Sequence, residues 1–306
     1  MLDFYCKYSK IITKGSVRMK TFKKIISVVL ALVMCLSFLA VGASAQEKSL
    51  NYLVIGDSIA KGFGLVNRDE TAYGRIVADT NGYNYRNFGL TGCTSDDMLG
   101  YLTDDDAYSM SYQSWVRWAD IISISVGGND YLLDNAVGLI FSSLILNNYT
   151  RFDSIAEKYY NNFSACIERI HELNPDAVIL IQTLFNTWTT FAGKVYKNAS
   201  NRINDKIMLY LDEHPGSFYV VDTVEAFEGK SSLITSDTIH PNAQGNILLA
   251  RLTLEKLNEI GLGAATEPVV LVEGEDRDYL IEYFPPVIGP IITLLANLAT
   301  GNIIRR

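Results

Sequence analysis

The sequence predicts an α/β fold whose parallel sheet is covered by helices on both faces. Five short apolar runs of strand length alternate along the chain with five segments of helical hydrophobic spacing. Small polar or glycine-containing turns directly follow several of these runs, at the places where parallel sheets bind ligands. We find no internal repeat and no low-complexity tract.

The predicted elements follow one another in strict alternation. The predicted strands are Tyr52–Ile55, Tyr83–Phe88, Ile121–Val126, Val178–Gln182 and Phe218–Val221. The predicted helices are Tyr73–Thr80, Ser95–Leu102, Phe152–Leu173, Phe191–Asp212 and Asn242–Ile260, with Pro241 suited to the first turn of the last one. Together they indicate one large domain at residues 46–262.

Residues 1–45 have the pattern of a secretory signal peptide. Three lysines between positions 20 and 24 precede the apolar stretch Ile25–Val41, and the small residues Ala43-Ser44-Ala45 form a cleavage site. We therefore expect a secreted or extracellular protein. An uncleaved membrane anchor is the alternative.

The charge balance argues against a nucleic-acid partner. The full chain has a net charge of −8, and the chain without residues 1–45 keeps 19 basic and 33 acidic side chains, a net charge of −14. Affinity for nucleic acid depends on basic side chains that neutralise phosphates. Two cysteines remain, Cys93 and Cys166, and the sequence leaves open whether they form a disulfide bridge or two buried thiols.

Residues 263–306 form a predicted C-terminal extension. Pro285-Pro286 leads into an apolar tail at residues 287–304, which is at the short end for a membrane span and is interrupted by Pro290 and two asparagines. Membrane contact through this tail and packing against the domain or a partner are both open.

Two blocks at strand ends carry candidate chemistry in the first third of the chain. Gly56-Asp57-Ser58 follows the first strand and presents Ser58 as a candidate nucleophile, although serine and aspartate there also suit a helix N-cap. Asn87–Thr94 follows the second strand, and its glycines allow a bare backbone N–H to approach a ligand. An ordinary turn is the alternative for this second block.

Two further blocks lie after the third strand and before the last helix. Gly127-Gly128-Asn129 presents the Asn129 amide as a donor for an oxyanion, unless it is a plain turn. Asp237 precedes His240 by three residues, so it can curl back and orient the imidazole. His240 is the leading general base among three histidines, since His171 and His214 fall in or at the end of helical patterns.

The four blocks in this order resemble the GDSL family of the SGNH hydrolases, over residues Leu53–Ala250. The resemblance implies a flavodoxin-like three-layer α/β/α sandwich with a mostly five-stranded parallel sheet. It also implies that Ser58 is the nucleophile and that Asp237 and His240 complete a triad. Ser58, Gly92 and Asn129 match the oxyanion-binding positions, with Gly89 as a second alignment for the glycine.

This resemblance implies an ester hydrolase that acts through an acyl-enzyme and needs no metal or organic cofactor. The substrate is expected to be a small-molecule or polymeric ester, either a lipid or acyl ester or an acetylated glycan. Candidate substrate contacts are Asp57, Tyr131, Phe185 and Trp188. The apolar run at residues 136–146 is a candidate for an acyl site or lid, and core packing is its alternative.

Two other classes of protein are weighed against this hypothesis. The first is a non-catalytic, glycan-binding surface protein on the same scaffold, which would bind without turnover. The second is an α/β-hydrolase, which requires a glycine two residues after the serine, where this chain has Ala60.

Overall fold

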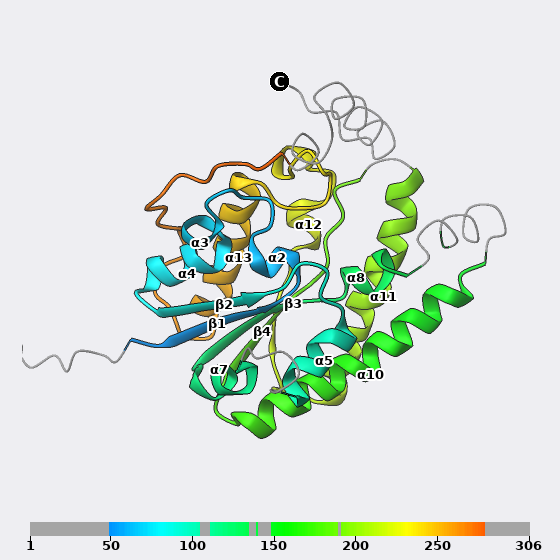
Figure 1. The fold of residues 1–306 in the computed structure, drawn as a ribbon, viewed down its shortest axis with the longest axis horizontal. Helices are drawn as coiled ribbons and strands as arrows, with labels where there is room; N and C mark the ends of the chain where they lie inside the picture. Colours follow the sequence, from blue (N-terminus) through cyan, green and yellow to red (C-terminus); the bar gives the residue numbers. More distant parts are fainter. Residues whose placement is uncertain (1–48, 105–110, 135–138, 140–147, 189–190, 279–306) are drawn as a thin grey trace, which may run out of the picture. The chain divides into compact units, whose positions relative to one another are not determined.

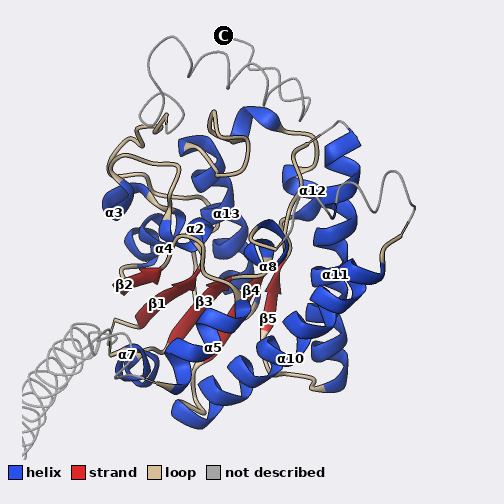
Figure 2. Ribbon diagram, turned by 45° about the vertical axis from the view of Figure 1, so that its right-hand side comes forward, coloured by secondary structure: helices blue, strands red, loops and turns tan. Residues whose placement is uncertain are grey.

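The computed structural model describes residues 49–104, 111–134, 139, 148–188 and 191–278. Its centre is a sheet of five parallel strands, drawn red in Figure 2. The strands are β1 (Asn51–Gly56), β2 (Asn84–Gly89), β3 (Ile121–Ser125), β4 (Val178–Gln182) and β5 (Tyr219–Val221). Their order, β2-β1-β3-β4-β5, is that of flavodoxin-like sheets. The predicted α/β fold is therefore confirmed.

Helices cover both faces of the sheet (Figure 1). Alternate strand residues point to opposite faces, so Leu53 and Ile55 belong to one apolar cluster and Tyr52 and Val54 to the other. The first cluster packs against α5 (Ser95–Thr103), α7 (Tyr112–Trp118), α10 (Thr150–Leu173) and α11 (Phe191–Glu213). The second packs against α4 (Tyr73–Asn81) and α13 (Ala243–Glu259). The three-layer sandwich is thus confirmed.

The long helices form where apolar residues recur every three or four positions. In α10 the buried side chains are Phe152, Ala156, Tyr159, Phe163, Cys166, Ile167 and Ile170. Helix α5 begins with a capping box, in which Thr94 and Asp97 each accept a hydrogen bond from the other's backbone N–H.

The short helices were not predicted, because four or five residues hold too few turns to produce a periodic pattern. They are α2 (Ser58–Lys61), α3 (Arg68–Thr71), α8 (Gly128–Leu132), α12 (Val224–Phe227) and a 3₁₀ turn at Ser231–Leu233. The seven-residue α7 was also missed. The placement of Pro241 in the first turn of the last helix is wrong: Asn242 is the N-cap, and Pro241 precedes it in a bridge to Ile234.

The carboxyl ends of β1 and β3 lie side by side, with Gly56 opposite Ser125. Strand β2 lies on one side of β1 and β3 lies on the other side, so the strand order reverses at β1. Sheets of this kind bind ligands at the carboxyl ends of the strands beside such a switch point.

The predicted signal peptide and the apolar tail at residues 287–304 lie outside the described residues. Within the described ranges, no helix combines the length and the apolar character needed to span a bilayer.

Candidate active site

Ser58 lies at the point where β1 passes into α2. The turn requires a glycine at position 56, because its φ is +120° and a Cβ there would lie 2.0 Å from the Ser125 carbonyl oxygen. Asp57 is the N-cap of α2, and Ser58 is the first residue of the helix. The Ser58 N–H therefore has no intrahelical acceptor and is free to serve a ligand.

The Asp57 carboxylate supports this turn. Its Oδ1 accepts hydrogen bonds from the Ile59 N–H at 2.9 Å and from Ser125 Oγ at 3.1 Å. Burial raises the pKa of Asp57 to about 6, although these hydrogen bonds favour the charged form. Asp57 lines the cavity described below, but the hydrogen bonds of its carboxylate hold the α2 backbone and Ser125.

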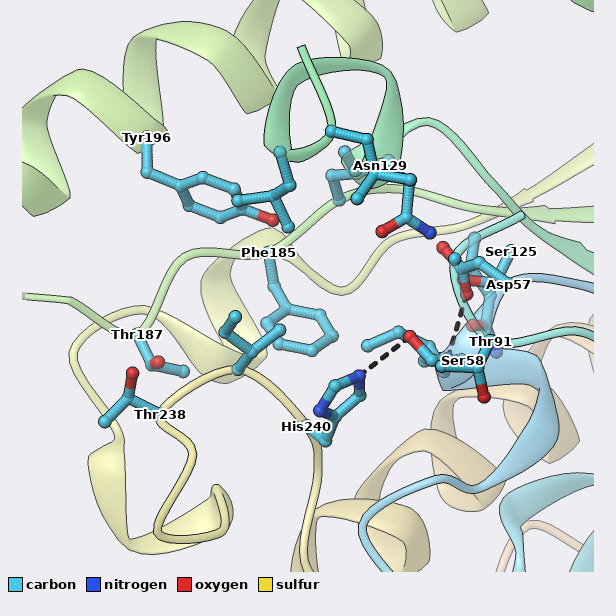
Figure 3. A pocket seen from close by; sticks show the side chains of 18 of the residues that line it. Asp57, Ser58, Thr91, Ser125, Asn129, Phe185, Thr187, Tyr196, Thr238 and His240 are labelled. Carbon is cyan, nitrogen blue, oxygen red and sulfur yellow. Dashed lines mark hydrogen bonds between the residues drawn. The ribbon is translucent and has the colours of Figure 1, made fainter. Parts of the chain in front are cut away.

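His240 and Asp237 complete a hydrogen-bonded chain that starts at Ser58. Figure 3 shows the bond between His240 and Ser58. His240 Nε2 lies 2.7 Å from Ser58 Oγ, and His240 Nδ1 lies 2.6 Å from Asp237 Oδ2. The structure therefore brings together the three residues that the sequence proposed for a triad. A hydroxyl so placed can pass its proton to a neutral imidazole.

Asp237 is held in its charged form. Burial alone would raise the pKa of this carboxyl, but the hydrogen bond from His240 and its charge hold the pKa below its usual value. The other oxygen, Oδ1, accepts from the backbone N–H groups of Ile239 and His240 at 2.9 and 3.0 Å. Asp237 can therefore orient the imidazole and stabilise an imidazolium.

The loop that carries Asp237 and His240 is fixed from the cavity side by Trp188. Thr238 adopts a left-handed backbone with φ of +67°, a conformation that is unfavourable for a β-branched residue. Its carbonyl accepts a hydrogen bond of 2.6 Å from Trp188 Nε1. Trp188, proposed from the sequence as a substrate contact, thus also positions this loop.

Gly92, the glycine proposed for oxyanion binding, lines the cavity described below, whereas Gly89 does not. The Gly89 N–H donates to Asn87 Oδ1 at 2.8 Å, and a Cβ at Gly89 would lie 2.4 Å from the Lys61 backbone nitrogen. Gly92 lines the cavity with φ of +82°, and its N–H enters no hydrogen bond with the described residues. Gly89 therefore serves the packing of α2 on β2.

Asn129 approaches Ser58 from the start of α8 (Figure 3). Its Nδ2 donates to the Cys93 carbonyl at 3.0 Å, which fixes the orientation of the amide. An amide nitrogen carries two hydrogens, so one remains to point at an oxyanion. The next residue, Asp130, binds Ser95 Oγ at 2.5 Å and so joins α8 to the start of α5, beside Gly92 and Cys93.

A cavity of about 420 Å³ opens in front of Ser58 and His240. Its walls come from the ends of β1, β3 and β4 and from the His240 loop. The apolar part of the lining comprises Ile59, Leu132, Leu133, Leu184, Phe185 and Ile239, together with Trp188 and Tyr196. Phe185 is held in place by stacking on Phe227, with ring centroids 4.1 Å apart.

Tyr131 is a correction to the proposed substrate contacts. It is buried in the core, its hydroxyl donates to the Phe152 carbonyl at 2.8 Å, and it is absent from the lining of the cavity. Besides Asn129, the side chains from this region that line the cavity are those of Leu132 in α8 and, just after the helix, Leu133. The apolar run at residues 136–146 lies outside the described residues except for Leu139, which is buried in the core.

Several residues around the site were not predicted from the sequence. Ser125, at the end of β3, could have been found from its place at a strand end beside Ser58. Phe63, whose ring centroid lies 4.7 Å from that of His240, gives no such signal. Tyr196 comes from α11, and nothing in the sequence pattern distinguishes it from core residues of that helix.

Comparison with known proteins identifies the family of this chain. The model of the GDSL-like lipase/acylhydrolase family matches residues 54–247, a range that includes Ser58, Gly92, Asn129, Asp237 and His240. The chain belongs to this family. It is therefore a GDSL-like hydrolase, as its sequence resemblance implied.

Relatives of this GDSL-like chain cover most of its length. The uncharacterized protein YpmR of Bacillus subtilis (strain 168) is 24% identical over 268 residues, which is 80% of this chain and 98% of that protein. The lipase Lip_vut3 from a goat rumen metagenome has a TM-score of 0.57 at 20% identity and covers 70% of this chain and 99% of its own. The phospholipase A1 of Streptomyces albidoflavus NA297 has a TM-score of 0.53 at 16% identity, with 68% and 99% covered. These likenesses show a shared fold.

The two cysteines of the GDSL-like domain are free thiols in the structure. Both are buried, and burial raises the pKa of each well above its usual value. Among the described residues, no group of three or more histidine, cysteine or acidic side chains is arranged to hold a metal ion.

Proposed function

We propose that this protein is an exported serine hydrolase that cleaves carboxylic esters through an acyl-enzyme on Ser58. The observation that carries this proposal is the unbroken hydrogen-bonded chain from Asp237 through His240 to Ser58. Export is supported by the signal-like pattern of residues 1–45 and by the acidity of the remaining chain.

Acylation begins when His240 Nε2 takes the proton of Ser58 Oγ, 2.7 Å away, as the oxygen attacks the ester carbonyl carbon. The carbonyl oxygen becomes an oxyanion. The N–H groups of Ser58 and Gly92 and the Asn129 amide bind it. When the intermediate collapses, the imidazolium protonates the alcohol that leaves, and the acyl group remains on Ser58.

Deacylation repeats these steps with water. His240 takes a proton from a water molecule that attacks the acyl-enzyme, and it returns this proton to Ser58 Oγ as the acid is released. Asp237 stays charged throughout and stabilises the imidazolium through Nδ1.

The walls of the cavity support an acyl substrate with an apolar chain. Six aliphatic or phenyl side chains line about 420 Å³ beside the nucleophile, which is room for a chain of several carbons. Burial of such a chain contributes about 0.8 kcal/mol per methylene group. We therefore favour a lipid or acyl ester over an acetylated glycan, whose acetyl group would leave most of the cavity unfilled.

The test is the hydrolysis of p-nitrophenyl esters of two to twelve carbons by the wild type and by the Ser58→Ala and His240→Ala variants. We expect each variant to lose a factor of about 10⁴ or more in kcat while it remains folded. The matched control is His214→Ala, because His214 lies at the end of α11 outside the cavity lining. This control should keep wild-type activity.

Labelling by a fluorophosphonate separates an enzyme from a non-catalytic glycan-binding protein. We expect stoichiometric modification of Ser58, and its loss in His240→Ala, since the reagent needs an activated hydroxyl. Saturable binding of a glycan without turnover or labelling would instead support the binding protein and reject the hydrolase.

A further inference from the structure

Residues 273–278, which we name the clasp, lie beyond both the family match at 54–247 and the catalytic domain that the sequence predicted at 46–262. After α13 the chain, drawn orange in Figure 1, runs over the outside of the domain and reaches the loop before Asp237 at Asp278. There the clasp contacts two segments that flank His240.

The first contact is with the loop after α2. The Val66 N–H donates to the Glu275 carbonyl, and the Arg277 N–H donates to the Gly64 carbonyl, both at 2.9 Å. The Asn67 side chain adds two hydrogen bonds of 3.0 Å to the backbone of Glu273 and Glu275. The loop and the clasp are thus paired like two short antiparallel strands.

This loop packs directly on His240 and its neighbour. A Cβ on Gly64 would lie 2.4 Å from the Pro241 carbonyl oxygen, so the backbones are in close contact. One residue earlier, the Phe63 ring packs on the imidazole. Displacement of the loop would therefore release one side of His240.

The second contact holds the two ends of the segment that contains His240. Asp278 Oδ1 accepts a hydrogen bond of 2.6 Å from Ser236 Oγ, and Ser236 directly precedes Asp237. Asp276 Oδ1 accepts one of 2.7 Å from the Ala243 N–H at the start of α13. The carboxylate of Asp276 thus binds one of the N–H groups that a helix start leaves without an intrahelical acceptor.

We propose that the clasp positions His240, with Asp276 and Asp278 as positioning residues; this inference rests on the proposed function. Proton transfer requires that His240 Nε2 stay within hydrogen-bond distance of Ser58 Oγ. A shift of about 1 Å in such a group costs up to about 10²-fold in rate. Trp188 holds this loop from the cavity side, and the clasp holds it from the outside.

The test compares the double variant Asp276→Ala/Asp278→Ala with the wild type. We expect kcat for a p-nitrophenyl ester to fall at least tenfold and KM to stay within twofold, because the cavity walls contributed by the ends of β1, β3 and β4 are unchanged. The rate of Ser58 labelling by a fluorophosphonate should fall by the same factor, since it depends on the same imidazole. Activity is measured at least 15 °C below the melting temperature of each variant.

Two matched variants control for charge and for location. The double variant Asp276→Asn/Asp278→Asn keeps an acceptor oxygen at each site, so it should stay within threefold of wild-type kcat. Glu267 lies elsewhere on the same extension, and its carboxylate pairs with Arg251 of α13. Glu267→Ala removes this carboxylate and should leave kcat unchanged.

Wild-type kcat in the double alanine variant overturns the proposal. A lowered melting temperature with unchanged kcat also overturns it, because the clasp would then be structural only. Loss of kcat in Glu267→Ala to the same degree would show a general effect of the extension and reject positioning by Asp276 and Asp278. Failure of the proposed function itself is distinguished by Ser58→Ala, which would then keep full activity.

Discussion

Asp57 stands beside the candidate nucleophile, but its carboxylate holds the backbone at the start of α2 and the hydroxyl of Ser125. A sequence motif identifies such a residue but does not show whether its side chain binds a substrate or other residues of the protein. The motif suggested a substrate contact, and the geometry favours a supporting role because the acceptor Oδ1 already has these partners.

The raised pKa of Asp57 predicts how the stability of the protein depends on pH. The pKa is about 6 in the folded chain and 3.8 in the unfolded one, so the folded state binds the proton more tightly. This group therefore stabilises the fold most at low pH, and its contribution is lost as pH rises through 6. Between pH 4 and pH 7 the loss amounts to about 2 kcal/mol.

Urea unfolding of the wild type and of Asp57→Asn at pH 4 and pH 7 measures this effect. Asparagine keeps an acceptor oxygen and does not titrate, so its stability relative to the wild type should improve by about 2 kcal/mol over this range. An unchanged difference between the two proteins at both pH values would contradict the assignment. Other titrating groups, Asp237 among them, cancel in the comparison.

Asn129 provides the sharpest test of oxyanion binding by a side chain. Asn129→Asp keeps the shape of the amide but removes its N–H donors, so we expect kcat to fall about 10²- to 10³-fold with little change in KM. Steady-state kinetics with one ester measures both constants. A kcat within threefold of the wild type would exclude Asn129 from the oxyanion site.

At the scale of elements, the packing of α2 on β2 depends on Gly89, which has no role in the proposed mechanism. A Cβ at Gly89 would lie 2.4 Å from the Lys61 nitrogen and 2.8 Å from the Ala60 carbonyl carbon, both backbone atoms that cannot move aside cheaply. Gly89→Ala should therefore destabilise the protein by about 3 kcal/mol through overpacking.

The control for Gly89→Ala is Gly216→Ala. Gly216 has φ of +87°, but a methyl group added there would have no other atom within 4 Å, so only backbone strain of about 1 kcal/mol is expected. Urea unfolding of both variants measures the difference. If both substitutions lower the free energy of unfolding by the same amount, the close contact between α2 and β2 is not the reason for a glycine at position 89.

The long elements were predicted well because their sequence signals are local. The third and fourth strands were predicted to within one residue, and α10 differs only by two residues at its start. The short helices were missed since they form around the turns of the site, where capping and close backbone contact decide the structure. Helix α2 depends on Asp57 as its cap and on glycines that pack against distant backbone.

At the scale of the whole molecule, the sheet order explains why the blocks meet. Ser58 follows β1 and Asn129 follows β3, and these strands are neighbours at the switch point of the sheet. The sequence could therefore predict that these residues converge. It also pointed to Phe185 and Trp188, which follow the fourth strand and line the cavity. It could not predict the rest of the cavity walls, since Leu133 and Tyr196 look like core residues until the sheet is assembled.

The reactivity of the two buried thiols reports on whether the core of the protein is intact. Cys93 and Cys166 are buried and unpaired with each other, and their raised pKa values keep them protonated. We expect iodoacetamide to modify them only after unfolding, as measured by mass spectrometry of their peptides. Protection that persists in the unfolded chain until a reducing agent is added would instead show a disulfide bond.

The proposed nucleophile, Ser58, precedes its proposed base, His240, by 182 positions. A polypeptide that is synthesised from its N-terminus thus carries an inert serine until nearly the whole of the hydrolase domain has been translated. If Ser58 and His240 act as proposed, a nascent or truncated polypeptide that lacks His240 has no hydrolytic activity. Ester hydrolysis would then begin only after the residues up to His240 have been translated, with no inhibitor required.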